Sequence, residues 1–239
     1  MPREFKAVSE KVVAIIPARG GSKGIPRKNV LDFCGKPLIA WTILQAIETA
    51  EIDSVYVTSD SEEILDVAEK YGAQTIARPV EIAGDTASSE SAIEHALGVI
   101  GTNQEIILML QVTSPLRKRD DFSRCIEQFR GDGWDSCFSG ALLEDFLIWR
   151  KAEDGSLESV NYDWQDRGIR QNRKPEFVEN GSIYMFKPEI LLNGNNRFGG
   201  NLGVFLMDFW QSFEIDEPQD WNLVETLFRN HLGKTYSVA

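Results

Sequence analysis

Two kinds of hydrophobic pattern alternate along the first 140 residues of the chain. Continuous apolar runs predict strands that are buried on both faces, and segments with apolar residues every three or four positions predict amphipathic helices. The predicted strands are Val12–Pro17, Ser54–Ser59, Ala73–Ala77, Glu105–Gln111 and Asp135–Ser139. The predicted helices are Pro37–Ala50, Ser61–Tyr71, Ser88–Ile100 and Arg119–Phe129.

This strand–helix alternation predicts an α/β fold with a doubly wound, mostly parallel sheet. Ligands of such sheets bind beyond the carboxyl ends of the strands. We therefore expect a site among the loops that follow Pro17, Ser59, Ala77 and Gln111.

The pattern changes after about residue 140. The segment 142–175 is polar, carries Trp149, Tyr162 and Trp164, and shows no helical period. Two further strands, Val178–Phe186 and Gly199–Met207, and a closing helix, Pro218–Leu232, are predicted beyond it. No repeat or low-complexity linker separates the halves, so we expect one domain over 1–239 with an excursion within 142–200.

The loop after the first predicted strand is rich in glycine and positive charge. Residues 18–29 read ARGGSKGIPRKN, with three glycines and four cations, in a chain of net charge −12. Glycines let a backbone approach a ligand closely, and the cations point to a polyanion such as a nucleoside triphosphate. Neither the P-loop spacing nor the dinucleotide GxGxxG spacing is present. Backbone amides together with Arg19, Lys23 and Lys28 are the predicted phosphate contacts.

Composition excludes several other classes of function. The net charge of −12 argues against a general nucleic-acid binder. Cys34, Cys125 and Cys137 lack metal-ligand spacing, and free thiols suggest a reducing compartment. The chain shows neither a leader-like N-terminus nor an apolar run near the roughly 18 residues of a membrane span, so we expect a cytoplasmic protein without a membrane partner.

Ordered motifs along nearly the whole chain strongly resemble those of the CMP-sialic acid synthetases, or acylneuraminate cytidylyltransferases. Pro17–Asn29 resembles the N-terminal signature of that family. The later matches are Arg78-Pro79 with Asp85–Ser89, Gln111–Arg117, Arg170-Gln171, Glu179–Tyr184 and Phe213–Asp216. The resemblance implies a Rossmann-like nucleotidyltransferase that uses CTP and a nine-carbon 2-keto sugar acid.

The resemblance also implies roles for particular residues, which we take as expectations. The implied catalytic residues are Arg19, Lys23, Lys28 and Arg170. The implied nucleotide contacts are Ala18, Arg19, Gly20, Asn29, Arg78, Ser88 and Ser89. The implied sugar contacts are Gln111, Arg170, Gln171, Asn180 and Tyr184.

A Mg²⁺ cofactor is expected on Asp216 and Glu214. Many relatives carry an Asp-x-Asp pair here, where this chain has Glu214-Ile215-Asp216. Alternation in an extended segment places both carboxylates on one face, and Mg²⁺ prefers one or two carboxylates plus substrate oxygens. A purely structural alternative is that Asp216 interacts with the N-terminus of the closing helix.

The acceptor sugar is left open by the sequence. Several bacterial relatives carry an Arg-Pro pair before the asparagine, where this chain has Val178-Glu179, and its Glu144–Trp149 segment also departs from theirs. Glu179–Ser182 instead resembles the animal enzymes and synthetases of the deaminated sugar Kdn, so N-acetylneuraminate, Kdn and legionaminate-type acids all remain candidates. The excursion resembles the family's dimerisation region, which implies a homodimer.

Two other functions stay open. One is Kdo cytidylyltransferase, although its first loop usually has a different spacing. The other is a nucleotide-binding protein that has lost catalysis, against which Arg19, Lys28, Gln111 and Asp216 argue.

Overall fold

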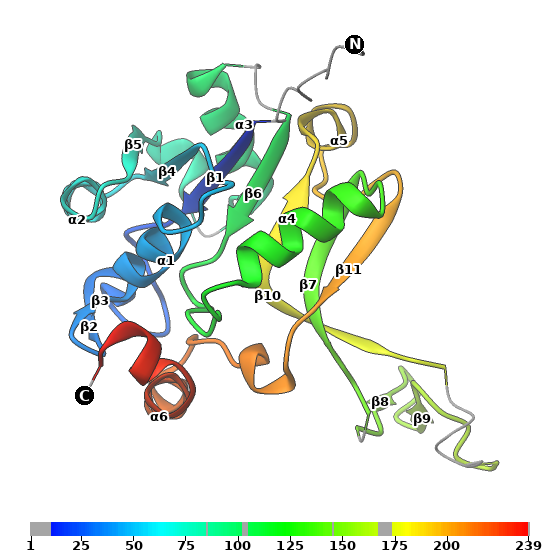
Figure 1. Ribbon diagram of the computed structural model, residues 1–239. Coiled ribbons are helices and arrows are strands. Elements are labelled where there is room, and N and C mark those ends of the chain that lie inside the picture. Colours follow the sequence, from blue (N-terminus) through cyan, green and yellow to red (C-terminus); the bar gives the residue numbers. More distant parts are fainter. Residues whose placement is uncertain (1–10, 85, 102–104, 145, 167–173, 239) are drawn as a thin grey trace, which may run out of the picture.

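A seven-stranded sheet forms the centre of the computed structural model, which describes residues 11–84, 86–101, 105–144, 146–166 and 174–238 (Figure 1). The strands stand in the order β11-β7-β10-β6-β1-β4-β5. They span Val12–Pro17 (β1), Ser54–Ser59 (β4), Gln74–Ala77 (β5), Ile106–Leu110 (β6), Ser136–Leu142 (β7), Phe177–Phe186 (β10) and Leu202–Leu206 (β11).

The sheet is parallel except for one strand. β1 pairs in parallel with β4 and β6, β4 with β5, and β7 with β11. β10 runs antiparallel between β6 and β7 and contains an irregularity between Glu179 and Tyr184. The predicted doubly wound, mostly parallel sheet is therefore confirmed.

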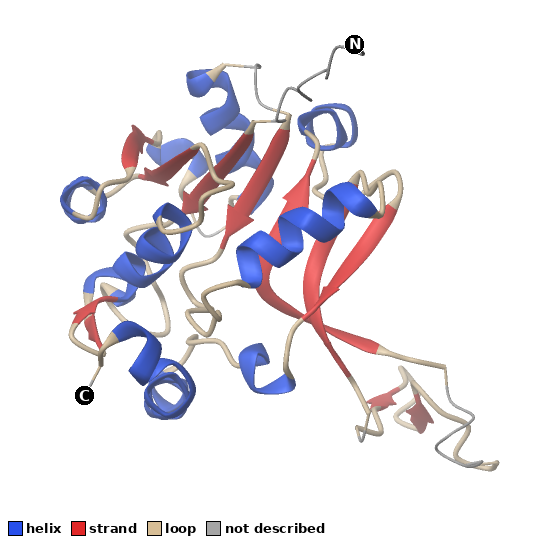
Figure 2. Ribbon diagram, in the orientation of Figure 1, coloured by secondary structure: helices blue, strands red, loops and turns tan. Residues whose placement is uncertain are grey.

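Helices cover both faces of the sheet (Figure 2). Alternate residues of β1 serve the two cores: Ala14 and Ile16 pack with α1, α2, α4 and α6, whereas Val13 and Ile15 pack with α3 and α5. This double burial explains why the strand is a continuous apolar run. The helices span Leu38–Ile47 (α1), Glu62–Lys70 (α2), Ser89–Ile100 (α3), Asp121–Gly131 (α4), Pro188–Gly194 (α5) and Pro218–Tyr236 (α6).

The ends of the helices and their capping bonds differ in places from those that the sequence predicts. α1 begins after Pro37, which is its N-cap, and ends at Ile47 rather than Ala50. Ser61 occupies the N-cap of α2, as predicted, but its side chain makes no capping bond, and its amide instead donates to Ser59 Oγ at 3.1 Å. Ser88 does cap α3, because its Oγ accepts from the amide of Ser91 at 3.1 Å.

The structure contains elements in both halves of the chain that the sequence pattern did not predict. A two-residue hairpin, β2 (Asp32–Phe33) with β3 (Lys36–Pro37), precedes α1, and α5 follows β10. β7 and β10 continue beyond the sheet toward a small hairpin, β8 (Trp149–Lys151) with β9 (Leu157–Ser159), which projects from the body of the molecule (Figure 1). We call the described parts of 142–177 the arm.

None of the helices in the described segments is both long enough and apolar enough to cross a membrane.

Candidate functional site

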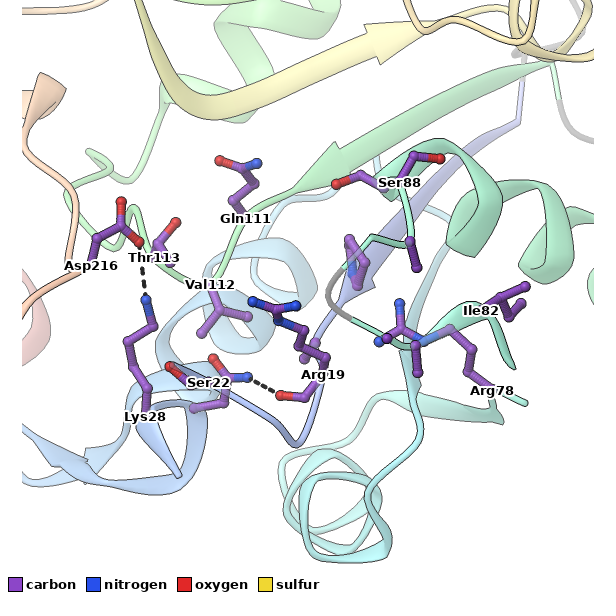
Figure 3. Close-up of a pocket in the computed structure, with 17 residues that line it drawn as sticks. Arg19, Ser22, Lys28, Arg78, Ile82, Ser88, Gln111, Val112, Thr113 and Asp216 are labelled. Carbon is purple, nitrogen blue, oxygen red and sulfur yellow. Dashed lines mark hydrogen bonds and ion pairs between the residues drawn. The ribbon is translucent and has the colours of Figure 1, made fainter. Parts of the chain in front are cut away.

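A cavity of about 360 Å³ opens beyond the carboxyl ends of β1, β5 and β6, where the fold class predicts a ligand site (Figure 3). Its walls come from the basic loop, from the segment between β5 and α3, and from the residues after β6. Its described lining residues are Pro17, Ala18, Arg19, Ser22, Lys28, Asn29, Arg78, Ile82, Ala83, Gly84, Ala87, Ser88, Ser89, Gln111, Val112, Thr113 and Asp216.

Many of the residues expected from the sequence meet in this cavity. Ala18, Arg19, Lys28, Asn29, Arg78, Ser88, Ser89, Gln111 and Asp216 all line it, although they come from four separate stretches of the chain. Gly20, Lys23, Glu214, Asn180 and Tyr184 are not among its lining residues. Arg170 and Gln171 lie outside the described residues.

The charged lining gives the cavity a positive character in an acidic protein. Arg19, Lys28 and Arg78 face the cavity together with a single described carboxylate, Asp216. The chain as a whole carries a net charge of −12. A cleft with a local excess of cations concentrates anions, so the lining suits a phosphate-bearing ligand.

The basic loop is held in shape by bonds to its own backbone, to Asp60 after β4 and to Glu63 of α2. The Asn29 side chain donates to the Arg19 carbonyl oxygen at 3.0 Å, which closes the loop on itself. The Gly20 amide donates to Asp60 at 2.9 Å. Arg27 has φ 56°, in the left-handed region, and its side chain forms an exposed ion pair with Glu63. These contacts hold the lining residues in place, whereas Lys23 is exposed and does not belong to the described lining.

Lys28 joins the basic loop, residues 18–29, to the segment Glu214–Asp216, which we call the carboxylate segment. Its buried Nζ donates to the Ile215 carbonyl oxygen at 2.5 Å and to Asp216 Oδ1 at 3.1 Å. The loop also approaches this segment at Gly24, where an added Cβ would overlap the Asp216 carbonyl oxygen. The two segments are almost 190 residues apart in the sequence, so this junction is a product of the fold.

Glu214 and Asp216 flank the fully buried Ile215 in the sequence, and neither of them is buried as Ile215 is. The Ile215 amide donates to the Thr113 carbonyl oxygen at 2.9 Å, and Glu214 accepts from Thr113 Oγ1 at 3.2 Å. Burial, with the neighbouring negative charge of Asp216, raises the pKa of Glu214 to about 7.

The carboxylate donor set fits a cation that is shared with a substrate. The Asp216 side chain is 67% exposed, while Glu214 is the more buried partner. No group of three or more His, Cys, Asp or Glu residues suited to a metal occurs within the described part of the chain. Mg²⁺ is commonly held by one or two carboxylates plus substrate phosphate oxygens, and the pair meets that requirement.

Arg117 is a supporting residue whose role the sequence did not reveal. Its side chain is fully buried, and its Nη2 donates to the carbonyl oxygens of Gln111 at 2.7 Å and Ser182 at 2.9 Å. Its Nη1 donates to Thr42 and Gln45, both at 3.2 Å. Burial lowers the pKa of this guanidinium to about 9. Arg117 therefore fixes the end of β6 against the irregular part of β10.

The irregular part of β10 supports Gln111 and Glu214 closely. Gly181 has φ 64°, and an added Cβ there would overlap side-chain oxygens of Glu214 and Gln111. Asn180 is 1% exposed and accepts hydrogen bonds from Ser139 Oγ at 2.5 Å and from the Ser182 amide at 3.2 Å. Position 181 therefore requires glycine, because its φ is positive and because there is no room for a side chain.

Two of the residues expected to contact the sugar, Tyr184 and Asn180, form hydrogen bonds within the protein. Tyr184 is 5% exposed and donates to Glu179 at 2.5 Å, and the Arg197 guanidinium lies 4.5 Å from the centre of its ring. Burial and Glu179 raise the pKa of Tyr184. Asn180 is likewise bonded internally. Direct contact of either side chain with a sugar stays a prediction.

Comparison with known proteins agrees with this site. A family model described as Cytidylyltransferase matches residues 13–145. A pseudaminic acid cytidylyltransferase of Campylobacter jejuni (strain 81-176) is 42% identical over 92% of this chain and 98% of its own length. An N-acylneuraminate cytidylyltransferase of Escherichia coli is 34% identical over 91% of this chain and 52% of its own, and one of Danio rerio is 35% identical over 91% and 50%. The chain thus spans about half the length of these last two relatives.

Solved structures share the fold at low sequence identity. A CMP-2-keto-3-deoxy-manno-octonic acid synthetase, solved with CTP, superposes with a TM-score of 0.70 at 18% identity and covers 93% of this chain and all of its own. A 4-diphosphocytidyl-2C-methyl-D-erythritol synthase of Anaerococcus prevotii gives a TM-score of 0.67 at 13% identity over 92% of this chain and 99% of its own. The family model and the 42% identical relative show that the chain belongs to the cytidylyltransferase family.

Proposed function

We propose that this protein transfers CMP from CTP to the anomeric hydroxyl of a nine-carbon 2-keto sugar acid and releases pyrophosphate. The observation that carries the proposal is the convergence of Arg19, Lys28 and Arg78 with Asp216 in one cavity of a cytidylyltransferase-family chain. Three cations beside one carboxylate form a suitable receptor for a triphosphate and its metal counter-ion.

In this reaction the acceptor oxygen bonds to the α-phosphorus of CTP as the bond from that phosphorus to the α–β bridging oxygen breaks. The proton of the hydroxyl leaves to a base or to water, and the negative charge goes to pyrophosphate. Arg19 and Lys28 neutralise charge that builds on the phosphate oxygens, and the bonded loop holds them in place beforehand. Phosphoryl-type transfer depends mostly on such positioning and electrostatic stabilisation.

We propose Mg²⁺ as the cofactor, held by Asp216 with Glu214. A bound Mg²⁺ would supply charge neutralisation on the phosphate oxygens. Lys28, which bonds both Asp216 and the Ile215 carbonyl oxygen, orients the carboxylate segment toward the cavity. Thr113 orients Glu214 in the same way.

For the acceptor, the comparisons favour pseudaminic acid. The relative named for that sugar is 42% identical at full length, whereas those named for N-acylneuraminate and N,N′-diacetyllegionaminic acid range from 31% to 35%. Kdn, suggested by Glu179–Ser182, is the second candidate. Both belong to the nine-carbon acids.

We also propose that the protein acts as a homodimer that is joined through the arm. The arm carries large apolar side chains in water: Phe146 is 52% exposed, Leu157 67% and Trp164 56%. Trp164 also lies beside the exposed Trp149, with ring centres 6.3 Å apart, and contiguous exposed apolar side chains mark association surfaces. A second copy of the chain is the occupant we propose, and sedimentation velocity on the intact chain tests it, with a single monomeric species as the contrary result.

The experiment that tests the function is pyrophosphate release from CTP with a panel of acceptors. The panel contains pseudaminic acid, N-acetylneuraminate, Kdn, N,N′-diacetyllegionaminic acid and the eight-carbon acid Kdo. Release with one or more nine-carbon acids supports the proposal. Release with Kdo alone would establish the Kdo alternative, and CTP binding without release in any reaction would establish a catalytically silent nucleotide-binding protein.

A further inference from the structure

Asp60 contacts two segments that line the cavity but does not belong to the described lining itself. It follows β4, which contributes no described lining residue of its own. Its side chain is 21% exposed and meets the basic loop on one side and Arg78 on the other. No motif described above includes Asp60.

The first contact of Asp60 fixes the basic loop. Its Oδ1 accepts a hydrogen bond from the Gly20 amide at 2.9 Å. Two residues earlier the loop is still bonded to β4, where the Ala18 amide donates to the Thr58 carbonyl oxygen at 3.0 Å. A Cβ added at Gly20 would come within 2.9 Å of the Ser61 Cβ, so the backbone passes too close to this turn for a side chain. The position of Arg19 is therefore set from both sides.

The second contact of Asp60 concerns Arg78. The same Oδ1 lies 3.7 Å from Arg78 Nη2. Arg78 is only 8% exposed, its amide donates to the Ser59 carbonyl oxygen at 2.8 Å, and its Nε has no hydrogen-bond partner within the described structure. Burial lowers the pKa of Arg78 and the nearby Arg19 lowers it further, whereas Asp60 acts in the opposite direction. A nearly buried cation needs such a countercharge.

One carboxylate thus links the backbone of one wall of the cavity, at Gly20, to a cation of another wall, Arg78. The turn that carries it is itself rigid, because the Ser61 amide donates to Ser59 Oγ at 3.1 Å. We infer that Asp60 is a positioning residue of the nucleotide side: it holds the basic loop at Gly20 and the guanidinium of Arg78 in the geometry that binds CTP. The inference rests on the proposed function, because it assigns CTP to this cavity.

Two substitutions separate the two contacts. Asp60→Asn keeps an oxygen that can accept from the Gly20 amide but removes the countercharge of Arg78, whereas Asp60→Ala removes both. Each is made in the full-length chain, alone and together with Arg78→Met. The matched control is Asp66→Asn, which neutralises an exposed aspartate on the neighbouring α2. The measurements are the Kd of CTP by calorimetry and the KM of CTP and of the acceptor.

We expect Asp60→Ala to weaken CTP binding about tenfold or more and Asp60→Asn about threefold, because charge-assisted hydrogen bonds are lost. The KM of the acceptor stays within about twofold in both. In the Arg78→Met background Asp60→Asn adds less than about twofold, since contacting residues are not additive. The Asp66→Asn control binds CTP like the unaltered chain.

Unchanged CTP binding in both Asp60 variants would overturn the inference, and so would an equal rise in the KM values of CTP and the acceptor. Should Asp60→Ala fail to fold, as judged by circular dichroism, Asp60→Asn alone decides. Failure of the proposed function has a different signature: the unaltered chain binds CTP but releases no pyrophosphate with any acceptor, and the CTP affinities still test Asp60. If the unaltered chain binds no CTP, both proposals are overturned.

Discussion

The part of this molecule that we propose to bind the nucleotide and the part that we propose to face the acceptor, here called the nucleotide side and the acceptor side, are built differently. The nucleotide side uses short loops after parallel strands, and the cations that line its cavity lie within the segments 17–29 and 78–89. The acceptor side uses the antiparallel β10 and its irregular stretch, where Asn180, Tyr184 and Glu179 bond to other protein groups. The first side presents charge to a ligand, whereas the second uses its polar groups to hold a shape.

The difference between the two sides shows which functional residues can be recognised from the sequence alone. A loop that presents cations to a ligand is recognisable by residue type and order. A residue that holds two distant segments together, as Arg117 holds Gln111 and Ser182, is recognisable only once the fold brings them together. The variants below test whether the two sides are as separable as the structure indicates.

The largest effect is expected at Lys28. Lys28→Met removes the ammonium that faces the cavity and that bonds Asp216 and the Ile215 carbonyl oxygen. We expect turnover at saturating CTP to fall by at least about tenfold, which corresponds to about 1.4 kcal/mol of transition-state stabilisation. Steady-state pyrophosphate release measures it, with the exposed Lys70→Met on α2 as control. Full turnover in Lys28→Met would show that Lys28 is not an active-site residue.

The next effect concerns the metal. Asp216→Asn should raise the Mg²⁺ concentration for half-maximal rate about tenfold, since changes around a metal site commonly cost that much in affinity. Titrating Mg²⁺ at fixed substrate concentrations measures it, and the exposed Asp132→Asn after α4 serves as control. An unaltered Mg²⁺ profile would place the metal elsewhere.

A third effect should appear in stability. Arg117→Met leaves the carbonyl oxygens of Gln111 and Ser182 without their buried donor. We expect the free energy of unfolding to fall by about 2–3 kcal/mol, because unsatisfied buried polar groups are costly. Urea unfolding measures it, and Arg119→Met, whose side chain is 71% exposed, should change stability by less than about 0.5 kcal/mol. Equal stability of both variants would mean that the two sides are not joined through Arg117.

The smallest effect on the fold is expected in the arm. Leu157→Ser replaces a side chain that is 67% exposed, so the free energy of unfolding of the monomer should change by less than about 0.5 kcal/mol. CTP affinity should also remain unchanged, while sedimentation velocity shows weaker self-association. Loss of CTP binding in Leu157→Ser would show that the arm also serves the nucleotide side.

The main strands were predictable because a strand buried on both faces is a continuous apolar run in the sequence, as in Val12–Pro17. The main helices were predictable from the spacing of their apolar residues. The residues of the cavity were largely predictable too, since Arg19, Lys28, Arg78, Gln111 and Asp216 all line it. Lys23 and Glu214 were expected beside them, and the structure places neither among the described lining residues.

The rest depended on distant contacts. No local pattern shows that β10 would pair with both β6 and β7, that Gly181 would pack against Glu214, or that Asp60 would reach Gly20 forty residues away. Residue types at these positions are ordinary, and only their partners make them specific. The contacts between residues that are distant in the sequence are therefore the part of the site that could not be predicted.

The central claim is that the basic cavity joins CMP to a sugar acid. The most direct measurement is ³¹P NMR of the unaltered protein with CTP, Mg²⁺ and pseudaminic acid. The account predicts a new phosphodiester resonance and free pyrophosphate in equal amounts, and neither when the acid is omitted. Persistence of the three CTP resonances with every nine-carbon acid, or pyrophosphate release without an acceptor, would contradict it.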